Sequence, residues 1–185
     1  MSHLFDTLKS FNARNASEEA INKMLEEIAK DVLSSGYFEV NGATTIYPMD
    51  IEFYLYDEMD SSREWMRDAK MYHKGPKVPF FPVIGCFYPH ESGVDVTFEN
   101  QNEGYRASFL IRAYKYEQNG EIIRNPRYLW EDLFGYGSFF DDNGLQIKWI
   151  DGPDNIDVQI NNSSRLNLKD KNQQPDMKPW RFYRE

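Results

Sequence analysis

The chain has 185 residues, with 30 acidic and 21 basic side chains and a net charge of −9 at neutral pH. This balance argues against a protein that binds nucleic acid through a uniformly basic surface, because affinity for a polyanion depends on Lys and Arg that neutralise phosphates. The length suits one domain with a hydrophobic core of its own. A single cysteine, Cys86, excludes an intrachain disulfide, and the sequence has no Cys/His spacing typical of zinc.

The N-terminus, Met-Ser-His-Leu-Phe-Asp, has no basic segment followed by an apolar run. No stretch approaches the roughly 18 consecutive apolar residues of a membrane helix. We therefore expect a cytoplasmic protein in a reducing compartment, with no membrane partner, no cofactor and no metal. The sequence leaves the oligomeric state open. Aromatic residues make up 16% of the chain, which favours a dense core or stacking on a ligand.

An amphipathic helix is predicted from Asn15 to Ser35. Its apolar side chains recur at the spacing of one helical face; they are Ile21, Met24, Leu25, Ile28 and Val32. Asn15 with Glu18 matches a capping box, and Gly36 supplies a C-terminal stop. The helix carries no pattern of catalytic residues, so we expect it to cover one face of a sheet.

The clearest strand pattern runs from Met49 to Tyr56, after a short strand at 37–40 and a turn at Asn41-Gly42, with Pro48 at its entry. Apolar and polar side chains alternate along it: Met49, Ile51, Phe53 and Leu55 on one face, and Asp50, Glu52, Tyr54 and Tyr56 on the other. Two interpretations of the second face stay open. It is either an ordinary solvated sheet face or the wall of a pocket in which Glu52 is a general base.

A polar segment from residue 57 to residue 77 follows, and we expect a long loop or a broken helix there. Three strands are then predicted: Val83–Tyr88, Val94–Glu99 and Ser108–Tyr116. The third contains a lone cation, Arg112, for which a structural salt bridge and a functional role are equally open. A short helix at Arg127–Phe134 and short strands at Leu145–Ile150 and Asp157–Ile160 complete the pattern.

Many short strands with few helices predict an α+β fold in one domain, residues 1–185. We expect an N-terminal helical segment at 1–36 and a β-rich core at 37–185. The predicted core is a curved, mainly antiparallel sheet, flanked by the amphipathic helix and by short helices.

Several segments share their order with the motifs of one enzyme family. They are Glu52-Phe53-Tyr54; His73; Gly85–His90 with Gly93-Val94; Phe109–Ala113; Ser164–Leu168; and Lys178–Phe182. In this order they resemble the alkyladenine (methylpurine, or 3-methyladenine) DNA glycosylases. The chain departs from that family at Glu91 and Ser92, which stand where the family has an intercalating tyrosine.

The resemblance implies a role for each matched side chain. Glu52 would activate the attacking water and Arg112 would orient it. Tyr54 and His90 would stack on an extruded base, with His73 hydrogen-bonded to it. Asn100 would discriminate between bases. Lys74, Lys77, Arg165 and Arg181 are the candidate contacts to a DNA backbone.

The predicted function is therefore cleavage of the N-glycosidic bond of a damaged or alkylated purine, as in base excision repair of damaged DNA. A second hypothesis gives the same fold a nucleobase or another small ligand to bind, without action on DNA. A third is a metal hydrolase that uses His73, His90 and Asp95. A purely structural or interaction role is the fourth.

Overall fold

The computed structural model describes residues 2–135, 144–152, 158–169 and 174–185. Within these ranges the helices are α1 (His3–Ser10), α2 (Glu18–Ser34), the short 3-10 helix η1 (Glu64–Met66) and α3 (Pro126–Phe134). The strands are β1 (Gly36–Val40), β2 (Thr44–Asp57), β3 (Cys86–His90), β4 (Gly93–Thr97), β5 (Tyr105–Tyr116), β6 (Ile122–Ile123), β7 (Ile147–Asp151), β8 (Ile160–Ser163) and β9 (Arg181–Arg184). The predicted α+β class and single domain are confirmed.

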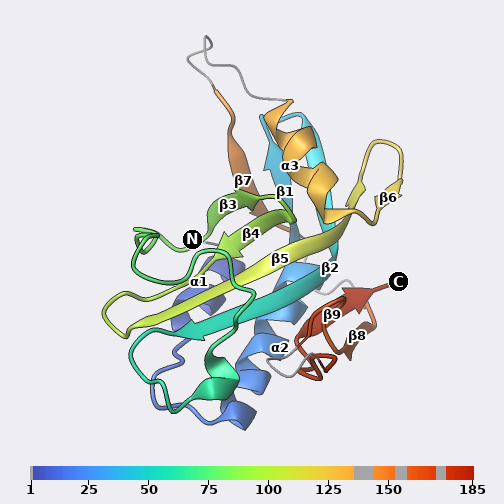
Figure 1. Cartoon of the computed structure of the whole chain (residues 1–185). Coiled ribbons are helices and arrows are strands. Elements are labelled where there is room, and N and C mark those ends of the chain that lie inside the picture. Colours follow the sequence, from blue (N-terminus) through green and yellow to red (C-terminus); the bar gives the residue numbers. More distant parts are fainter. Residues whose placement is uncertain (1, 136–143, 153–157, 170–173) are drawn as a thin grey trace.

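The strands form one curved antiparallel sheet in the order β3-β4-β5-β2-β1-β7 (Figure 1). β2 is its longest strand and pairs with β5 along one edge. The opposite edge of β2 is shared, because β1 pairs with its first residues and β9 pairs with Asp50, Ile51 and Glu52 in its middle. The C-terminal strand thus lies directly beside the Glu52 segment.

One face of the sheet packs on α1 and α2, which lie together on the same side of it (Figure 1). The side chains that meet there are apolar and buried, and they include Ile21, Leu25, Ile28 and Val32 of α2 with Ile51, Phe53, Leu55, Phe109 and Ile111 of β2 and β5. Phe53 is fully buried and contacts the rings of Phe98, Phe109 and Phe182 in edge-on geometry. This face is the hydrophobic core of the protein.

The predicted helix at Asn15–Ser35 exists, but its N-terminal cap is a different residue. Ser17 accepts a hydrogen bond from the backbone N–H of Ala20, and α2 begins at Glu18. Asn15 instead has a positive φ of 59° and lies in the preceding turn. The predicted capping box was therefore wrong, because a serine nearer the helix satisfies the free N–H groups.

The Glu52 strand is longer than predicted, since β2 begins at Thr44 and runs through Pro48. A register shift between Pro48 and Asp50 accommodates the proline, which donates no hydrogen bond to the sheet. The short elements α1, β6 and β9 carried no sequence signal that we recognised. The predicted strand at Asp157–Ile160 begins outside the described residues, and β8 starts at Ile160.

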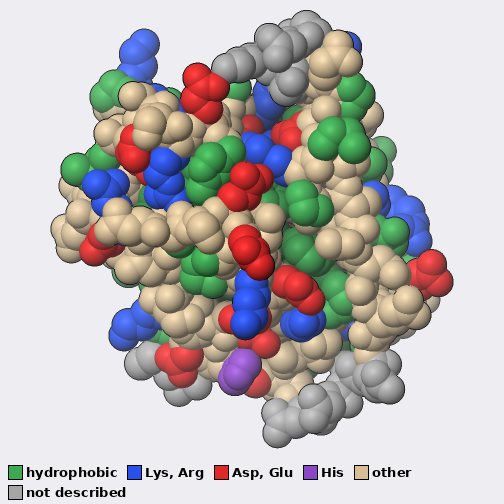
Figure 2. All heavy atoms as spheres, turned by 90° about the horizontal axis from the view of Figure 1, so that it is seen from below, with side chains coloured by type: hydrophobic (Ala, Val, Ile, Leu, Met, Phe, Trp, Pro, Cys, Tyr) green, Lys and Arg blue, Asp and Glu red, His purple; other side chains and the backbone are tan. Residues whose placement is uncertain are grey.

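None of the helices in the described part of the chain is long and apolar enough to cross a membrane. The surface seen from below the view of Figure 1 mixes Lys and Arg with Asp and Glu, without a dominant area of either sign (Figure 2).

Candidate functional site

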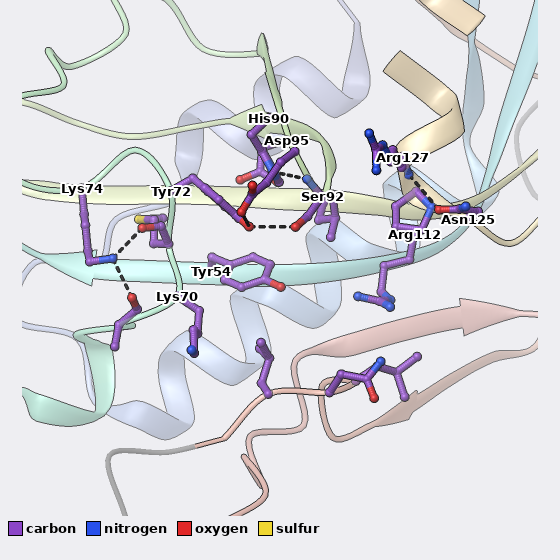
Figure 3. A pocket seen from close by; sticks show the side chains of 18 residues that line it. Tyr54, Lys70, Tyr72, Lys74, His90, Ser92, Asp95, Arg112, Asn125 and Arg127 are labelled. Carbon is purple, nitrogen blue, oxygen red and sulfur yellow. Dashed lines mark hydrogen bonds and ion pairs between the residues drawn. The ribbon is translucent and has the colours of Figure 1, made fainter. Parts of the chain in front are cut away.

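A cavity of about 680 Å³ opens on the face of the sheet opposite the helices. Strands, loops and a helix start all contribute to it, and the described side chains that carry the argument below are Tyr54, Lys70, Tyr72, Lys74, His90, Asp95, Leu110, Arg112, Arg127 and Leu166. Figure 3 shows Tyr54 in the middle, with Lys70 and Lys74 on one side and Arg112 and Arg127 on the other. The cavity is large enough for a nucleobase with its sugar.

Glu52 lies behind this cavity and has no exposed surface. Its Oε1 accepts a hydrogen bond of 2.5 Å from the Tyr54 hydroxyl, and its Oε2 accepts one of 2.9 Å from the backbone N–H of Leu166. Arg112 places a guanidinium nitrogen 3.5 Å from Oε2. These three contact residues all line the cavity, so Glu52 is separated from its interior by one layer of side chains.

The position of Glu52 follows from the alternation of β2. Side chains two residues apart point to the same face, so Glu52 and Tyr54 share the polar face while Ile51 and Phe53 face the core. The sheet register adds Leu110 of β5, which pairs directly with Glu52. The lone cation of β5, Arg112, is two residues further along and reaches the same carboxylate. Arg112 therefore has the ion-pair partner expected of a lone cation in an apolar strand, and that partner is Glu52.

Tyr54 is 8% exposed. Burial raises the pKa of its hydroxyl far above the ordinary value, and the charge and hydrogen bond of Glu52 raise it further. Tyr54 therefore stays a phenol and donates its proton to Glu52 throughout the physiological range. On the other side of its ring lies the Arg165 guanidinium, 5.0 Å from the centroid.

A second polar group in the cavity centres on Asp95 of β4, which is 2% exposed. His90 Nε2 lies 3.1 Å from Asp95 Oδ1, and the Ser108 hydroxyl donates to Oδ2 over 2.9 Å. His73 lies beneath, with no exposed surface. Its Nε2 is 3.8 Å from Asp95 Oδ2, and its Nδ1 is 3.1 Å from Glu99 Oε2.

The structure thus brings His73 and His90 to one carboxylate, but only His90 lines the cavity. The predicted base contact of His73 does not fit a side chain with no exposed surface. His90 is already stacked on a ring of the protein, Tyr72, with centroids 4.1 Å apart and planes 21° apart. Tyr72 is 42% exposed, so it presents the free aromatic surface at the mouth that the sequence had assigned to His90.

The mouth of the cavity is locally basic although the whole chain is acidic. The described lining residues include four basic side chains, Lys70, Lys74, Arg112 and Arg127, and two acidic ones, Glu91 and Asp95. Lys70 and Arg127 are exposed to solvent. The Lys74 ammonium donates to the carbonyls of two neighbouring residues of its loop, and burial lowers its pKa. An anionic group on a ligand would find cations here.

Two of the predicted contacts to a DNA backbone are held in ion pairs with carboxylates of the protein. Arg165 is 4% exposed, and its guanidinium binds Asp68 and Asp176. Burial alone would lower the pKa of Arg165, but these two carboxylates raise it. Arg181 forms a two-pronged contact with Asp50, at 3.1 Å and 2.7 Å. Both arginines hold the C-terminal segment against the sheet and have little surface to offer to a phosphate.

Lys77, a predicted backbone contact, and Asn100, the predicted base-discriminating residue, both lie apart from the cavity. Lys77 is exposed but does not line it. Asn100 lies in the turn between β4 and β5, where its side chain accepts from the backbone N–H groups of Asn102 and Glu103. Asn100 therefore stabilises a turn, which is a common role for asparagine.

The structure gives no support to the metal-hydrolase hypothesis. Asp95 contacts both His73 and His90, but the described residues contain no group of three or more His, Cys, Asp or Glu side chains that could hold a metal ion. The two imidazoles approach different oxygens of Asp95 and make hydrogen-bond or ion-pair contacts with it.

Comparisons with protein-family models, with curated proteins and with solved structures found no match. The resemblance to alkyladenine DNA glycosylases therefore rests on the short motifs of the sequence alone.

The arrangement has the parts of an acid–base site. Two buried carboxylates, Glu52 and Asp95, lie on one face of the sheet, an arginine contacts one of them, and aromatic rings flank the opening. Sequence reasoning missed Tyr72, Lys70 and Arg127, since each lies in a segment without regular alternation. It treated Asp95 only as a metal ligand. The signal for Asp95 was a carboxylate at an apolar-flanked strand position, Val94-Asp95-Val96.

Proposed function

We propose that the protein hydrolyses the N-glycosidic bond of a damaged or alkylated purine, with Glu52 as the base that activates water. The observation that carries this proposal is the environment of Glu52. Its carboxylate receives hydrogen bonds from Tyr54 and from the Leu166 N–H, lies 3.5 Å from Arg112, and sits behind a cavity with an aromatic and basic opening. Donors and cations surround it, which fits the carboxylate form that a general base requires.

Cleavage of an N-glycosidic bond develops positive charge on the sugar, so a nearby carboxylate stabilises the transition state as well as activating water. Glu52 would do both. Arg112 would hold the water in place beside it. The base would lie against Tyr54 and the exposed ring of Tyr72, because flat aromatic surfaces favour stacking. Glu52 behind the cavity, together with the side chains that line it, would therefore supply the roles of this reaction.

The basic mouth supports a substrate that carries phosphate. Lys70 and Arg127 are exposed and flank the cavity, so they would approach the phosphates next to the base that enters. The acidic remainder of the protein limits non-specific affinity for duplex DNA. Single-stranded DNA or an already unpaired base is the favoured substrate, since extrusion of a stacked base costs a few kcal/mol.

The test is a cleavage assay. The protein is incubated in excess with oligonucleotides that contain hypoxanthine, ethenoadenine or a methylated adenine, and abasic sites are then cut with alkali. Glu52→Gln should reduce base release by about 100-fold to 10,000-fold, the usual contribution of a general base. The matched control is Glu27→Gln, the same change on the exposed surface of α2, which should leave release unchanged. Absence of release by excess wild-type protein contradicts the proposal.

A second candidate function is binding of a nucleobase without cleavage. The observation in its favour is that Glu52 has no exposed surface and that both of its oxygens already accept hydrogen bonds. Equilibrium dialysis with adenosine, inosine and their monophosphates distinguishes the two. Saturable binding by wild-type protein, together with no base release from any oligonucleotide, favours the binding function.

A further inference from the structure

We infer that the cavity takes a nucleoside that carries a phosphate on each side, with one phosphate held by Lys70 and the other by Arg127. This rests on the proposed function and narrows its substrate class, because a nucleoside or a nucleoside monophosphate would fill only part of the site. Three features of the cavity support it: the positions of its exposed cations, their free donors and the apolar floor between them.

The two exposed cations lie on opposite sides of the cavity. Figure 3 shows Lys70 on one side of the Tyr54 ring and Arg127 on the other. They come from distant segments, because Lys70 belongs to the loop after β2 and Arg127 to the first turn of α3. Both side chains are exposed. Since a base seated over Tyr54 would lie between them, each cation meets a different group of the ligand.

Lys70 is the free cation on its side of the cavity. Its backbone N–H donates to Asp68 Oδ1 over 3.0 Å, which fixes the start of the loop. The neighbouring Lys74 donates its ammonium protons to the loop carbonyls of Ala69 and Met71, over 2.6 Å and 2.7 Å. Lys74 therefore stabilises the loop. The Lys70 ammonium has no hydrogen-bond or ion-pair partner among the residues that the structure describes.

Arg127 is likewise positioned by its backbone. Asn125 caps α3, and its side-chain oxygen accepts from the Arg127 N–H over 3.2 Å. The next N–H, of Tyr128, donates to the Asn125 carbonyl, so the helix offers a ligand its arginine rather than these N–H groups. The guanidinium contacts Glu131 through Nε at 3.4 Å, in a pair exposed to solvent. Such pairs are weak, and the two terminal nitrogens are suited to a phosphate.

The floor between the two cations suits a flat ring. Tyr54, Met71 and Leu110 form a buried apolar cluster, and Leu168 packs against it. All four residues line the cavity. A base buries apolar surface there, whereas a phosphate would lose its hydration without gaining a partner. The ligand therefore places its ring over the floor and its charges at the two sides.

The remaining charged side chains of the lining, apart from Lys74, have partners within the protein. They are Arg112 with Glu52, Asp95 with His90, and Glu91 with Tyr72. Lys70 and Arg127 are thus the exposed cations that a ligand would neutralise. In a protein with a net charge of −9, two such cations on one cavity favour an anionic ligand at this place over the rest of the surface.

A nucleotide unit matches this arrangement. Its sugar carries the 5′ and 3′ phosphates on opposite sides, while the base extends from C1′. With the base over the floor, one phosphate is directed toward each cation. The shared chemistry is a nucleoside between two phosphates, and its source is either a free nucleoside 3′,5′-bisphosphate or an internal unit of a single strand.

The experiment measures binding, so its result does not depend on base release. Equilibrium dialysis compares adenosine, its 5′-monophosphate, its 3′-monophosphate, its 3′,5′-bisphosphate and a trinucleotide with adenosine in the middle. The bisphosphate should bind about tenfold or more tightly than either monophosphate, because a hydrogen bond to a charged group contributes about that factor. Tighter binding of the trinucleotide than of the bisphosphate assigns the site to a strand, and weaker binding assigns it to the free nucleotide.

Two variants assign the phosphates to the cations. Lys70→Met should abolish the gain in affinity from one of the two phosphates and keep the gain from the other. Arg127→Met should do the reverse. The matched control is Lys77→Met, at an exposed lysine that does not line the cavity, which should leave every affinity unchanged. All three changes are on the exposed surface, where substitutions rarely affect folding, and circular dichroism checks this.

Three results contradict the inference: equal affinity for the bisphosphate and the monophosphates, loss of the same phosphate contribution in both variants, or no measurable binding of any of the five ligands. Base release by wild type from an oligonucleotide would still support the proposed hydrolysis in each case. Conversely, recognition of two phosphates without base release from any oligonucleotide would support this site and contradict hydrolysis.

Discussion

On the two faces of β2, different interactions cover side chains that are equally buried. Phe53 and Glu52 are neighbours in the sequence, and neither has exposed surface. Phe53 packs among other aromatic rings, and the hydrophobic effect favours its burial. Glu52 accepts hydrogen bonds from Tyr54 of its own strand and from the Leu166 N–H of the C-terminal segment. Burial of an apolar side chain needs only shape, whereas burial of a carboxylate needs particular partners in particular places.

The apolar face of β2 therefore contributes mainly to stability, whereas the polar face is the candidate for function. The apolar face tolerates changes that keep volume and hydrophobicity. The polar face concentrates charged groups with their partners, and such clusters are typical of sites where ligands bind. The predictions below measure the two faces against each other, beginning with the largest effect on stability.

Phe53→Ala should lower the free energy of unfolding by about 3–5 kcal/mol, because it leaves a cavity among three aromatic rings. Urea unfolding followed by circular dichroism measures the change. The control is Tyr128→Ala, at a residue that is 50% exposed, which should stay within about 0.5 kcal/mol of wild type. If Phe53→Ala lowered the free energy of unfolding by less than about 1.5 kcal/mol, the neighbouring side chains would have repacked to fill the cavity.

Arg165→Met should cost about 3 kcal/mol of unfolding free energy, since it leaves the buried carboxylate of Asp68 and the half-buried carboxylate of Asp176 without their cation. The same urea experiment applies. Lys77→Met, a change at an exposed lysine, should be within about 0.5 kcal/mol of wild type. Equal stability of the two variants would show that Arg165 is not needed to hold the C-terminal segment and would return it to the candidates for ligand contact.

The smallest effect depends on pH. Burial would raise the pKa of Asp176, but the Lys178 N–H and Arg165 lower it below the ordinary value. A carboxyl with a lowered folded-state pKa contributes stability above the unfolded-state value of about 3.9, and the contribution is lost as pH falls through the folded-state pKa. The melting temperatures of wild type and Asp176→Asn should therefore differ at pH 6 and converge below pH 4. A difference that persists unchanged at low pH contradicts this origin.

The sequence predicted the apolar half of the molecule well for a physical reason. Periodicity of apolar residues reports which face of a helix or strand is buried, and α2 and β2 have long, regular patterns. The same alternation placed Glu52 and Tyr54 together. It could not show that this second face is covered, because the cover comes from segments without periodicity, such as the loop that contains Tyr72 and the turn at Leu166.

The positions of the predicted basic residues also depend on contacts that the sequence does not reveal. The sequence does not distinguish the four predicted basic residues from one another. In the structure, Arg165 and Arg181 are held in ion pairs with Asp68 and Asp50. Lys74 lines the cavity and Lys77 does not. Whether an arginine faces solvent or a buried aspartate depends on which distant segment packs beside it. The contacts Arg165–Asp68 and Arg181–Asp50 join residues far apart in the chain, and nothing local encodes them.

The hydrogen bond from the Leu166 N–H to Glu52 spans 114 positions of the sequence. Together with the pairing of β9 to the middle of β2, it makes a segment that is synthesised well after Glu52 a component of the site. During translation, at roughly 5–20 residues per second, the Glu52 strand emerges many seconds before its covering segment. A nascent chain therefore holds an incomplete cavity until the segment around Leu166 and strand β9 have been synthesised.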